Sequence, residues 1–200
     1  MKKILLFLLD SLIPFYKGWR KFATSTILPN SYWDYVKFRL GKSKTYWPKD
    51  KTCLVTHPRK IYVGINSKIG RPGAYISGAG GVWIGKYVRF GPNVGIVSSN
   101  HDIYERDKYN CAPIKIGDYC WIGMNALVFA GVELGPSTIV GGGSVVTKSF
   151  PEGYCIVAGN PAKIIKYLDK EKVKMPSHPE YYGYLPKEEF EKNRKKYIDL

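Results

Sequence analysis

Residues 114–149 read IKIGDY CWIGMN ALVFAG VELGPS TIVGGG SVVTKS, six consecutive blocks of six residues. Each block carries an aliphatic residue at its third position and a small or aliphatic residue two positions earlier. A repeat of six residues matches neither the 3.6 residues per turn of an α-helix nor the two-residue alternation of a β-strand. Three short strands per turn of a coil satisfy it, with the third residue pointing inward and a glycine-tolerant corner after it. The stretch therefore predicts a triangular prism of stacked parallel strands.

The same pattern continues toward the N-terminus, with inward residues expected at Val63, Ile69, Ile84, Phe90 and Ile96. Two interruptions break it, a surplus of three residues within 73–81 and an excursion over 100–113. We therefore predict an all-β fold, a parallel β-helix over 61–162 with a long loop at 100–113. A basic, aromatic extension over 1–60 precedes it, and a tail with a short helix over 163–200 follows.

The charge of the chain is strongly basic, with 31 Lys and Arg against 16 Asp and Glu and a net charge of +15. Such a balance favours phosphates, nucleotides, anionic lipid or nucleic acid as partners. The excess lies on the flanks and no nucleic-acid-binding motif accompanies it, so we expect no nucleic-acid partner. Four cysteines without a CxxC pair indicate reduced thiols in a cytoplasmic protein.

The N-terminal segment has helical apolar spacing, interrupted by Asp10 and ended by Pro14. It is too short for a membrane span, and no small-x-small cleavage site follows it closely. Two interpretations stay open: a helix packed on the body of the protein, or a helix in peripheral contact with the inner face of the membrane. The residues involved are apolar Leu5, Leu8, Leu9, Leu12, Ile13 and Tyr16, and basic Lys17, Arg20 and Lys21.

The hexads occur together with His101-Asp102, with GGGSVVTK at 141–148 and with AGNPA at 158–162. In this combination, residues 61–166 resemble the hexapeptide-repeat acyltransferases, and among them the maltose and galactoside O-acetyltransferases and the capsule or O-antigen acetyltransferases. The resemblance implies a left-handed coil, a handedness that periodicity alone does not give. It also implies a homotrimer with active sites between subunits, acetyl-CoA as acyl donor, and no metal.

His101 is the candidate general base. Of the three histidines, His57, His101 and His178, it alone falls where the coil breaks into its long excursion, and loops on rigid scaffolds often carry function. Neutral imidazole accepts protons at physiological pH, and the resemblance aligns His101 with the catalytic histidine of the family. Asp102 either orients this imidazole or caps the loop.

The remaining candidate residues divide into acceptor and donor sides. By resemblance Asn93 holds the acceptor, although a corner residue with left-handed backbone is the alternative, and Asn100 beside His101 joins it on that side. Trp121 follows the inward Cys120 and should point outward. By resemblance it packs on the pantetheine arm, and contact with the long loop or another subunit is the alternative. Lys148 and Lys163 either contact the phosphates of coenzyme A or are ordinary surface charges. The members of the donor side are Trp121, Gly142, Thr147, Lys148 and Lys163.

Competing functions are a zinc enzyme on the same prism, a binding scaffold without catalysis, and an acetyltransferase acting on an antibiotic such as chloramphenicol or a streptogramin. Three scattered histidines offer no zinc cluster, which disfavours the first. The aromatic and basic flanks favour a sugar or a lipid-linked sugar as acceptor. We therefore predict an O-acetyltransferase acting on a surface-polysaccharide precursor.

Overall fold

The computed structural model describes residues 2–25, 31–176 and 178–200. It confirms the inward positions of the hexads, because every one of their central side chains is at most 4% exposed. The small residues two positions earlier, such as Ala126 and Thr138, are buried beside them. The central residues are Val63, Ile69, Ile84, Phe90, Ile96, Ile116, Ile122, Val128, Leu134, Val140 and Val146.

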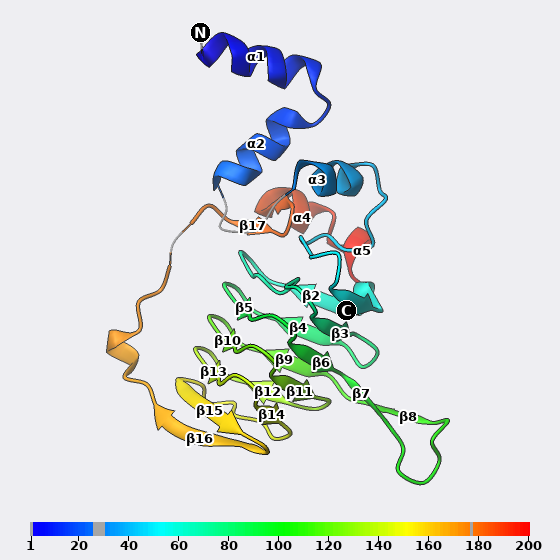
Figure 1. Cartoon of the computed structure of the whole chain (residues 1–200), viewed down its shortest axis with the longest axis vertical. Coiled ribbons are helices and arrows are strands. Elements are labelled where there is room, and N and C mark those ends of the chain that lie inside the picture. The colour runs from blue at the N-terminus through cyan, green and yellow to red at the C-terminus, as the bar shows by residue number, and fades with distance from the viewer. Residues whose placement is uncertain (1, 26–30, 177) are drawn as a thin grey trace.

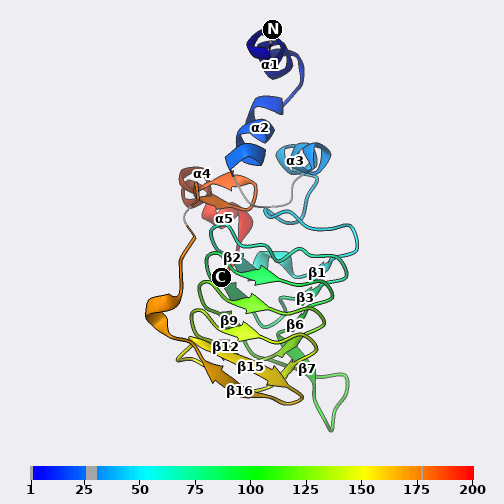
Figure 2. The same cartoon turned by 60° about the vertical axis from the view of Figure 1, so that its left-hand side comes forward.

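Three parallel sheets form the sides of the prism, which is a left-handed β-helix (Figures 1 and 2). The first sheet contains β1 (Leu54–Thr56), β3 (Tyr75–Ser77), β6 (Gly95–Val97), β11 (Leu127–Phe129) and β14 (Val145–Val146). The second contains β2 (Ile61–Val63), β4 (Val82–Ile84), β9 (Ile114–Ile116) and β12 (Glu133–Leu134). The third contains β5 (Arg89–Phe90), β10 (Trp121–Ile122), β13 (Ile139–Val140), β15 (Cys155–Gly159) and β16 (Ala162–Tyr167).

The register of the pairing repeats the hexad period. Ile116 pairs with Leu134, Ile122 with Val140, and Val128 with Val146, so each coil advances by three hexads. The surplus within 73–81 is divided between two corners around Ile76, which is fully buried in β3 and pairs with Ile96. The structure thus adds Ile76 to the inward residues, at a position where the six-residue spacing of the sequence is interrupted.

The long excursion is a hairpin rather than an irregular loop. β7 (Ser99–His101) and β8 (Tyr109–Cys111) pair antiparallel, and the chain rejoins the prism where the Ala112 amide donates to the Ser98 carbonyl at 3.1 Å. In Figure 1 this hairpin projects beyond the stacked coils. Residues at its tip are therefore free to meet other molecules while its base is fixed to the coil.

Both ends of the stack extend past the visible hexads. Parallel pairing reaches back through β1 to a bridge between Lys49 and Gly70. At the other end β15 pairs parallel with β13, and after a cis Asn160-Pro161 peptide β16 returns antiparallel along it. The antiparallel strand β16 occupies the edge of the third sheet and so ends its parallel ladder.

The C-terminal segment returns along the outside of the prism, through the short helix η2 (Lys170–Lys172), to cover the first coil (Figure 1). It forms β17 (Tyr181–Tyr182), β18 (Leu185–Pro186), α4 (Lys187–Lys192) and α5 (Arg194–Tyr197). Phe190 is 1% exposed, stacked on Tyr182 at 4.2 Å and 4.9 Å from the Tyr46 ring. The Tyr46 hydroxyl lies 3.0 Å from the carbonyl oxygen and 2.6 Å from the amide nitrogen of Val63. An aromatic cap thus shields the open end of the interior, as terminal coils of solenoids require.

The N-terminal helices lie beyond this cap (Figures 1 and 2). They are α1 (Lys2–Leu12), α2 (Tyr16–Ser25) and α3 (Tyr32–Arg39). Phe22 of α2 is buried among Tyr35, Tyr181 and Tyr184, whereas most apolar side chains of α1 are exposed. Within the described part of the chain, no helix is long and apolar enough to cross a membrane.

Removing the Phe190 ring tests the cap. Phe190→Ala should lower the free energy of unfolding by about 3 to 5 kcal/mol, because it leaves a cavity among packed aromatic rings. Urea unfolding followed by circular dichroism measures this change. Glu191→Ala, an exposed neighbour on the same helix, is the matched control and should unfold like the wild type. Equal midpoints for the two variants would contradict a stabilising cap.

Candidate active site

His101 stands on β7 with its imidazole exposed. Its Nδ1 lies 2.7 Å from the Arg106 carbonyl oxygen, and the ring packs against Tyr109 with centroids 4.3 Å apart. A carbonyl only accepts hydrogen bonds, so Nδ1 carries the proton and donates it. In neutral imidazole this leaves the Nε2 lone pair available. The hairpin thus fixes both the tautomer and the orientation that a general base needs.

Asp102 closes the turn of the same hairpin. Its Oδ1 accepts from the amides of Tyr104 at 2.9 Å and Glu105 at 3.0 Å, and its Oδ2 accepts from Asn110 Nδ2 at 3.0 Å. These hydrogen bonds, that from Glu105 first, lower the pKa of the carboxyl below its ordinary value. Of the two roles left open by the sequence, this geometry is that of the loop cap. The carbonyl of Arg106 fills the orienting role, and no side-chain pattern could have pointed to it.

The candidate residues divide among different parts of the prism. We call the corner between the first and second sheets the hairpin edge, because β7 and β8 leave the coil there. Thr147 and Lys148 follow β14 on this same edge. The corner between the third and first sheets, here the glycine edge, carries Asn93 and Gly142. Ser98 lies five positions after Asn93 across the first sheet, a span of about 16 Å at about 3.3 Å per residue.

At the glycine edge, Asn93 adopts a left-handed backbone with φ of 57°, as a corner residue does. Its side chain packs over Gly73, where an added Cβ would lie 1.9 Å from the amide oxygen. Gly73 therefore leaves the space that this exposed side chain occupies. Two coils further along, Gly142 is exposed and next to Gly143, around whose missing Cβ no atom lies within 4 Å. The outer surface of this corner is open to close approach by a ligand.

Trp121 points outward from the third sheet, with 56% of its surface exposed. Met124, 54% exposed, begins the neighbouring glycine-edge corner and extends this apolar surface. Lys163 is exposed on β16, three strands from β10 in the same sheet, a separation of about 14 Å. Asn100 is exposed on β7 beside His101 and opposite Asn110. The donor-side and acceptor-side candidates of one chain are thus all accessible, but they do not converge on one point.

The described residues offer no metal site, and three of their four cysteines are buried. They contain no group of three or more His, Cys, Asp or Glu side chains placed to hold a metal ion. Burial raises the pKa of Cys120 to about 12, so this thiol stays protonated. Cys155 is buried and its pKa is raised by the same cause. Cys111, at the end of β8, is the exposed thiol among the four cysteines, so the hairpin presents both His101 and this thiol to solvent.

Comparison with known proteins agrees with this architecture. Residues 113–148 match the family model of the bacterial transferase hexapeptide (six repeats). WcaF of Escherichia coli (strain K12), whose name assigns it to colanic acid biosynthesis as an acetyltransferase, is 30% identical over 129 residues, covering 64% of this chain and 68% of WcaF. The chain belongs to the hexapeptide-repeat transferase family. Galactoside O-acetyltransferase of the same organism is 33% identical over 96 residues, 46% of this chain and 47% of that relative.

Among solved structures, a hexapeptide-repeat acetyltransferase from Vibrio cholerae O1 biovar eltor, complexed with acetyl coenzyme A, superposes with a TM-score of 0.62 at 25% identity. The match covers 70% of this chain and 81% of that one. A maltose O-acetyltransferase from Clostridium difficile 630 shares the fold with a TM-score of 0.56 at 24% identity, covering 82% and 89%. The chain spans about half the length of several sequence relatives, between 45% and 58%.

Proposed function

We propose that this protein transfers an acetyl group from acetyl-CoA to a hydroxyl of a carbohydrate, with His101 as general base. The observation that carries the proposal is the hydrogen bond from His101 Nδ1 to the Arg106 carbonyl, because it presents Nε2 as a proton acceptor on an exposed hairpin. The acetyl-CoA bound in the Vibrio cholerae relative and the O-acetyltransferase name of the galactoside relative support the donor and the reaction class.

In the reaction, one proton moves from the acceptor hydroxyl to His101 and then from His101 to the coenzyme A thiolate. Nε2 accepts the proton of the acceptor hydroxyl as its oxygen attacks the thioester carbonyl, which forms a tetrahedral oxyanion. Its collapse breaks the carbon–sulfur bond, and the coenzyme A thiolate takes the proton back from Nε2. During the intermediate the imidazolium keeps donating from Nδ1 to the Arg106 carbonyl, which stabilises its charge.

The working unit in this proposal is a homotrimer. The hairpin edge and the glycine edge of one chain are separated by a full face of the prism, and the hairpin extends away from its own coils (Figure 1). A neighbouring copy brings its Trp121 and Gly142 to the hairpin without any change of fold. Trp121 then packs on the pantetheine arm, while Thr147, Lys148 and Lys163 face the phosphates of coenzyme A.

A carbohydrate acceptor fits the surroundings of His101. Tyr104 and Tyr109 on the hairpin are 88% and 60% exposed, and exposed aromatic rings stack on sugar faces. Asn93 of one subunit and Asn100 of the next offer amide hydrogen bonds to sugar hydroxyls. The colanic acid relative supports a surface-polysaccharide precursor as the acceptor class.

The N-terminal helix α1 is assigned in this proposal to the surface of an anionic membrane at its cytoplasmic side. Its apolar side chains at Leu5, Phe7, Leu8 and Leu12 are 45% to 75% exposed. Helix α1 lies at the end of the molecule furthest from the coils, as both views show (Figures 1 and 2). Lys17 is exposed at the start of α2, where it would face anionic headgroups.

Replacing the base tests the mechanism. His101→Ala should lower kcat by about 10² to 10⁴, because a positioned general base contributes that much, while acetyl-CoA binding and thermal stability stay at the wild-type level. Asp102→Asn keeps the acceptor oxygen of the turn and should slow turnover far less. Product should be quantified by mass spectrometry, since exposed Cys111 reacts with thiol reagents. Full activity in a folded His101→Ala protein would reject His101 as the base.

Mixing two inactive subunits tests the shared site. His101→Ala and Trp121→Ala proteins should each be poorly active at low acetyl-CoA concentration, whereas co-expressed subunits should regain about a quarter of wild-type activity. That fraction is the share of interfaces in a randomly mixed ring that pair an intact His101 with an intact Trp121. Light scattering checks the trimer mass in the same samples. A mixture no more active than its components would refute a site divided in this way.

Co-sedimentation with lipid vesicles tests the role of α1. Phe7→Asp combined with Leu12→Asp should weaken binding to phosphatidylglycerol-containing vesicles at least tenfold, because each side chain contributes about 1.5 to 3 kcal/mol when buried in lipid. Ile165→Asp is the control, since Ile165 is 65% exposed on β16, at the opposite end of the prism. If both variants lose vesicle binding equally, or if the wild type does not bind vesicles, α1 is not a membrane-binding helix.

A further inference from the structure

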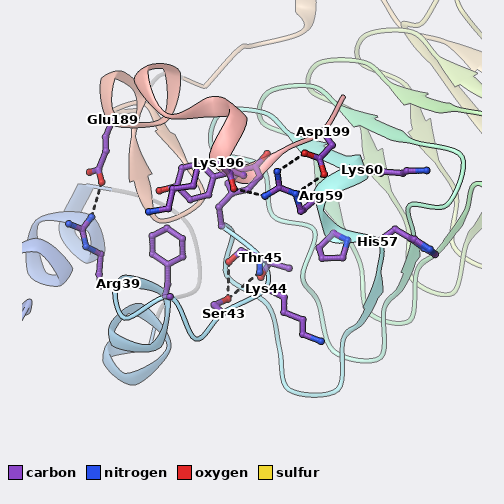
Figure 3. A pocket seen from close by; sticks show the side chains of 15 residues that line it. Arg39, Ser43, Lys44, Thr45, His57, Arg59, Lys60, Glu189, Lys196 and Asp199 are labelled. Carbon is purple, nitrogen blue, oxygen red and sulfur yellow. Dashed lines mark hydrogen bonds and ion pairs between the residues drawn. The ribbon is translucent and has the colours of Figure 1, made fainter.

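A cavity of about 690 Å³ opens at the start of the prism, between the segment 38–46, the turn η1 (Pro58–Lys60) and α5 (Figure 3). None of the residues assigned above to acetyl transfer lines it. Its size falls in the range of small-molecule sites, which spans about 300 to 1,000 Å³. The cavity therefore has room for a ligand of its own.

Two ion pairs hold the walls of this cavity together. Arg39 Nη1 lies 2.9 Å from Glu189 Oε1 and ties α3 to α4. Arg59 donates to the Lys196 and Lys195 carbonyls at 2.7 and 3.1 Å and to Asp199 Oδ2 at 2.6 Å, which ties η1 to the end of α5. Figure 3 shows the two pairs on opposite sides of Lys196. Both arginines are therefore already paired with carboxylates of the cavity wall.

Two of the lining lysines, Lys44 and Lys196, remain to act on a ligand. Among the described residues, the ion pairs leave Lys44, Lys60 and Lys196 without a carboxylate partner. The Lys60 Nζ donates to the Ala79 carbonyl at 3.3 Å, outside the lining of the cavity. With five Lys and Arg against two acids in its lining, the cavity carries a surplus of positive charge. An anion entering it gains from this surplus.

The other walls favour a sugar beside that anion. The rings of Phe38 and Tyr197, both half-buried, lie 6.1 Å apart. Such aromatic surfaces stack on the apolar faces of sugars. On the opposite side Ser43 supplies a half-buried hydroxyl, oriented by its hydrogen bond to the Thr45 carbonyl. Cations, rings and this hydroxyl together fit a sugar that carries a phosphate.

The position of the cavity relates it to His101. η1 follows β1 on the hairpin edge, and β1, β3 and β6 are successive neighbours in the first sheet. The hairpin with His101 leaves this edge directly after β6. Two strand spacings of about 4.8 Å place the base of the hairpin about 10 Å along the axis. A ligand bound here is thus on the same edge as the base of the His101 hairpin.

We propose that this cavity binds the phosphate or diphosphate of a sugar phosphate, and that it selects acceptors carrying such a group. The proposal rests on the proposed acetyl transfer for its biological use, but the binding event itself does not need catalysis. Two sources share the chemistry: a soluble nucleotide sugar and a lipid-linked diphosphate sugar. Lys44 and Lys196 contact the phosphate in either case, whereas the remainder of the ligand differs.

Calorimetric titration distinguishes binding from catalysis. Wild-type protein and His101→Ala should both bind UDP-glucose or glucose 1-phosphate, and neither should bind glucose measurably. Lys44→Gln with Lys196→Gln should weaken binding about tenfold or more, since each exposed charge contributes up to about fivefold. The matched control is Lys42→Gln with Lys195→Gln, neighbours of the same charge that do not line the cavity. Affinity should also fall as salt is added.

The lipid-linked source is tested with vesicles that carry a polyprenyl diphosphate glucose. The Phe7→Asp and Leu12→Asp background removes binding through α1, so retention by these vesicles and not by plain ones reports the headgroup. If binding of either probe requires Lys44 and Lys196, the proposal is supported. The probe that is bound then shows whether the ligand is a soluble or a lipid-linked sugar phosphate. Absence of binding to every phosphate-bearing probe, or equal loss in the control pair, overturns it. If the wild-type protein binds a phosphate-bearing probe but transfers no acetyl group to it, the result would instead count against the proposed function.

Discussion

The structure depends on one constraint: every sixth side chain must fill the interior of a triangular coil. Ile122 stacks between Phe90 and Val140, and Val128 between Ile96 and Val146, so each inward residue packs against the coil before and the coil after. The backbone groups of each side are satisfied by the neighbouring coils in the same register. Such a stack is stable only while it continues, and each end needs a separate solution.

The two ends are closed differently. Behind the last coil, β16 folds back antiparallel on β15 and occupies the sheet edge. In front of the first coil, an aromatic cluster built from both flanks of the chain covers the apolar interior. The basic and aromatic flanks therefore have a structural role at this end. Their exposed lysines and apolar side chains also provide the binding surfaces proposed above.

Sequence reasoning succeeded where a feature repeats and failed where contacts are distant or made by backbone. The hexads predicted the inward residues, and the glycine corner at 141–143 predicted an exposed turn. Ile76 escaped notice because the spacing around it is irregular, and parallel pairing ahead of residue 61 lacks visible hexads. The hairpin over 99–111, the Arg106 carbonyl and the meeting of Phe190 with Tyr46 depend on tertiary structure. No local propensity encodes those contacts.

The aromatic cap also imposes an order on folding. Phe190 and Tyr197 complete a surface whose other half, at Tyr46 and Tyr62, lies more than a hundred residues earlier in the chain. During synthesis the coils can stack one after another as they leave the ribosome, since their pairing involves successive turns. The apolar opening of the first coil stays uncovered until the final helices emerge. A nascent chain of this protein consequently exposes that surface until residues 187–197 have been synthesised.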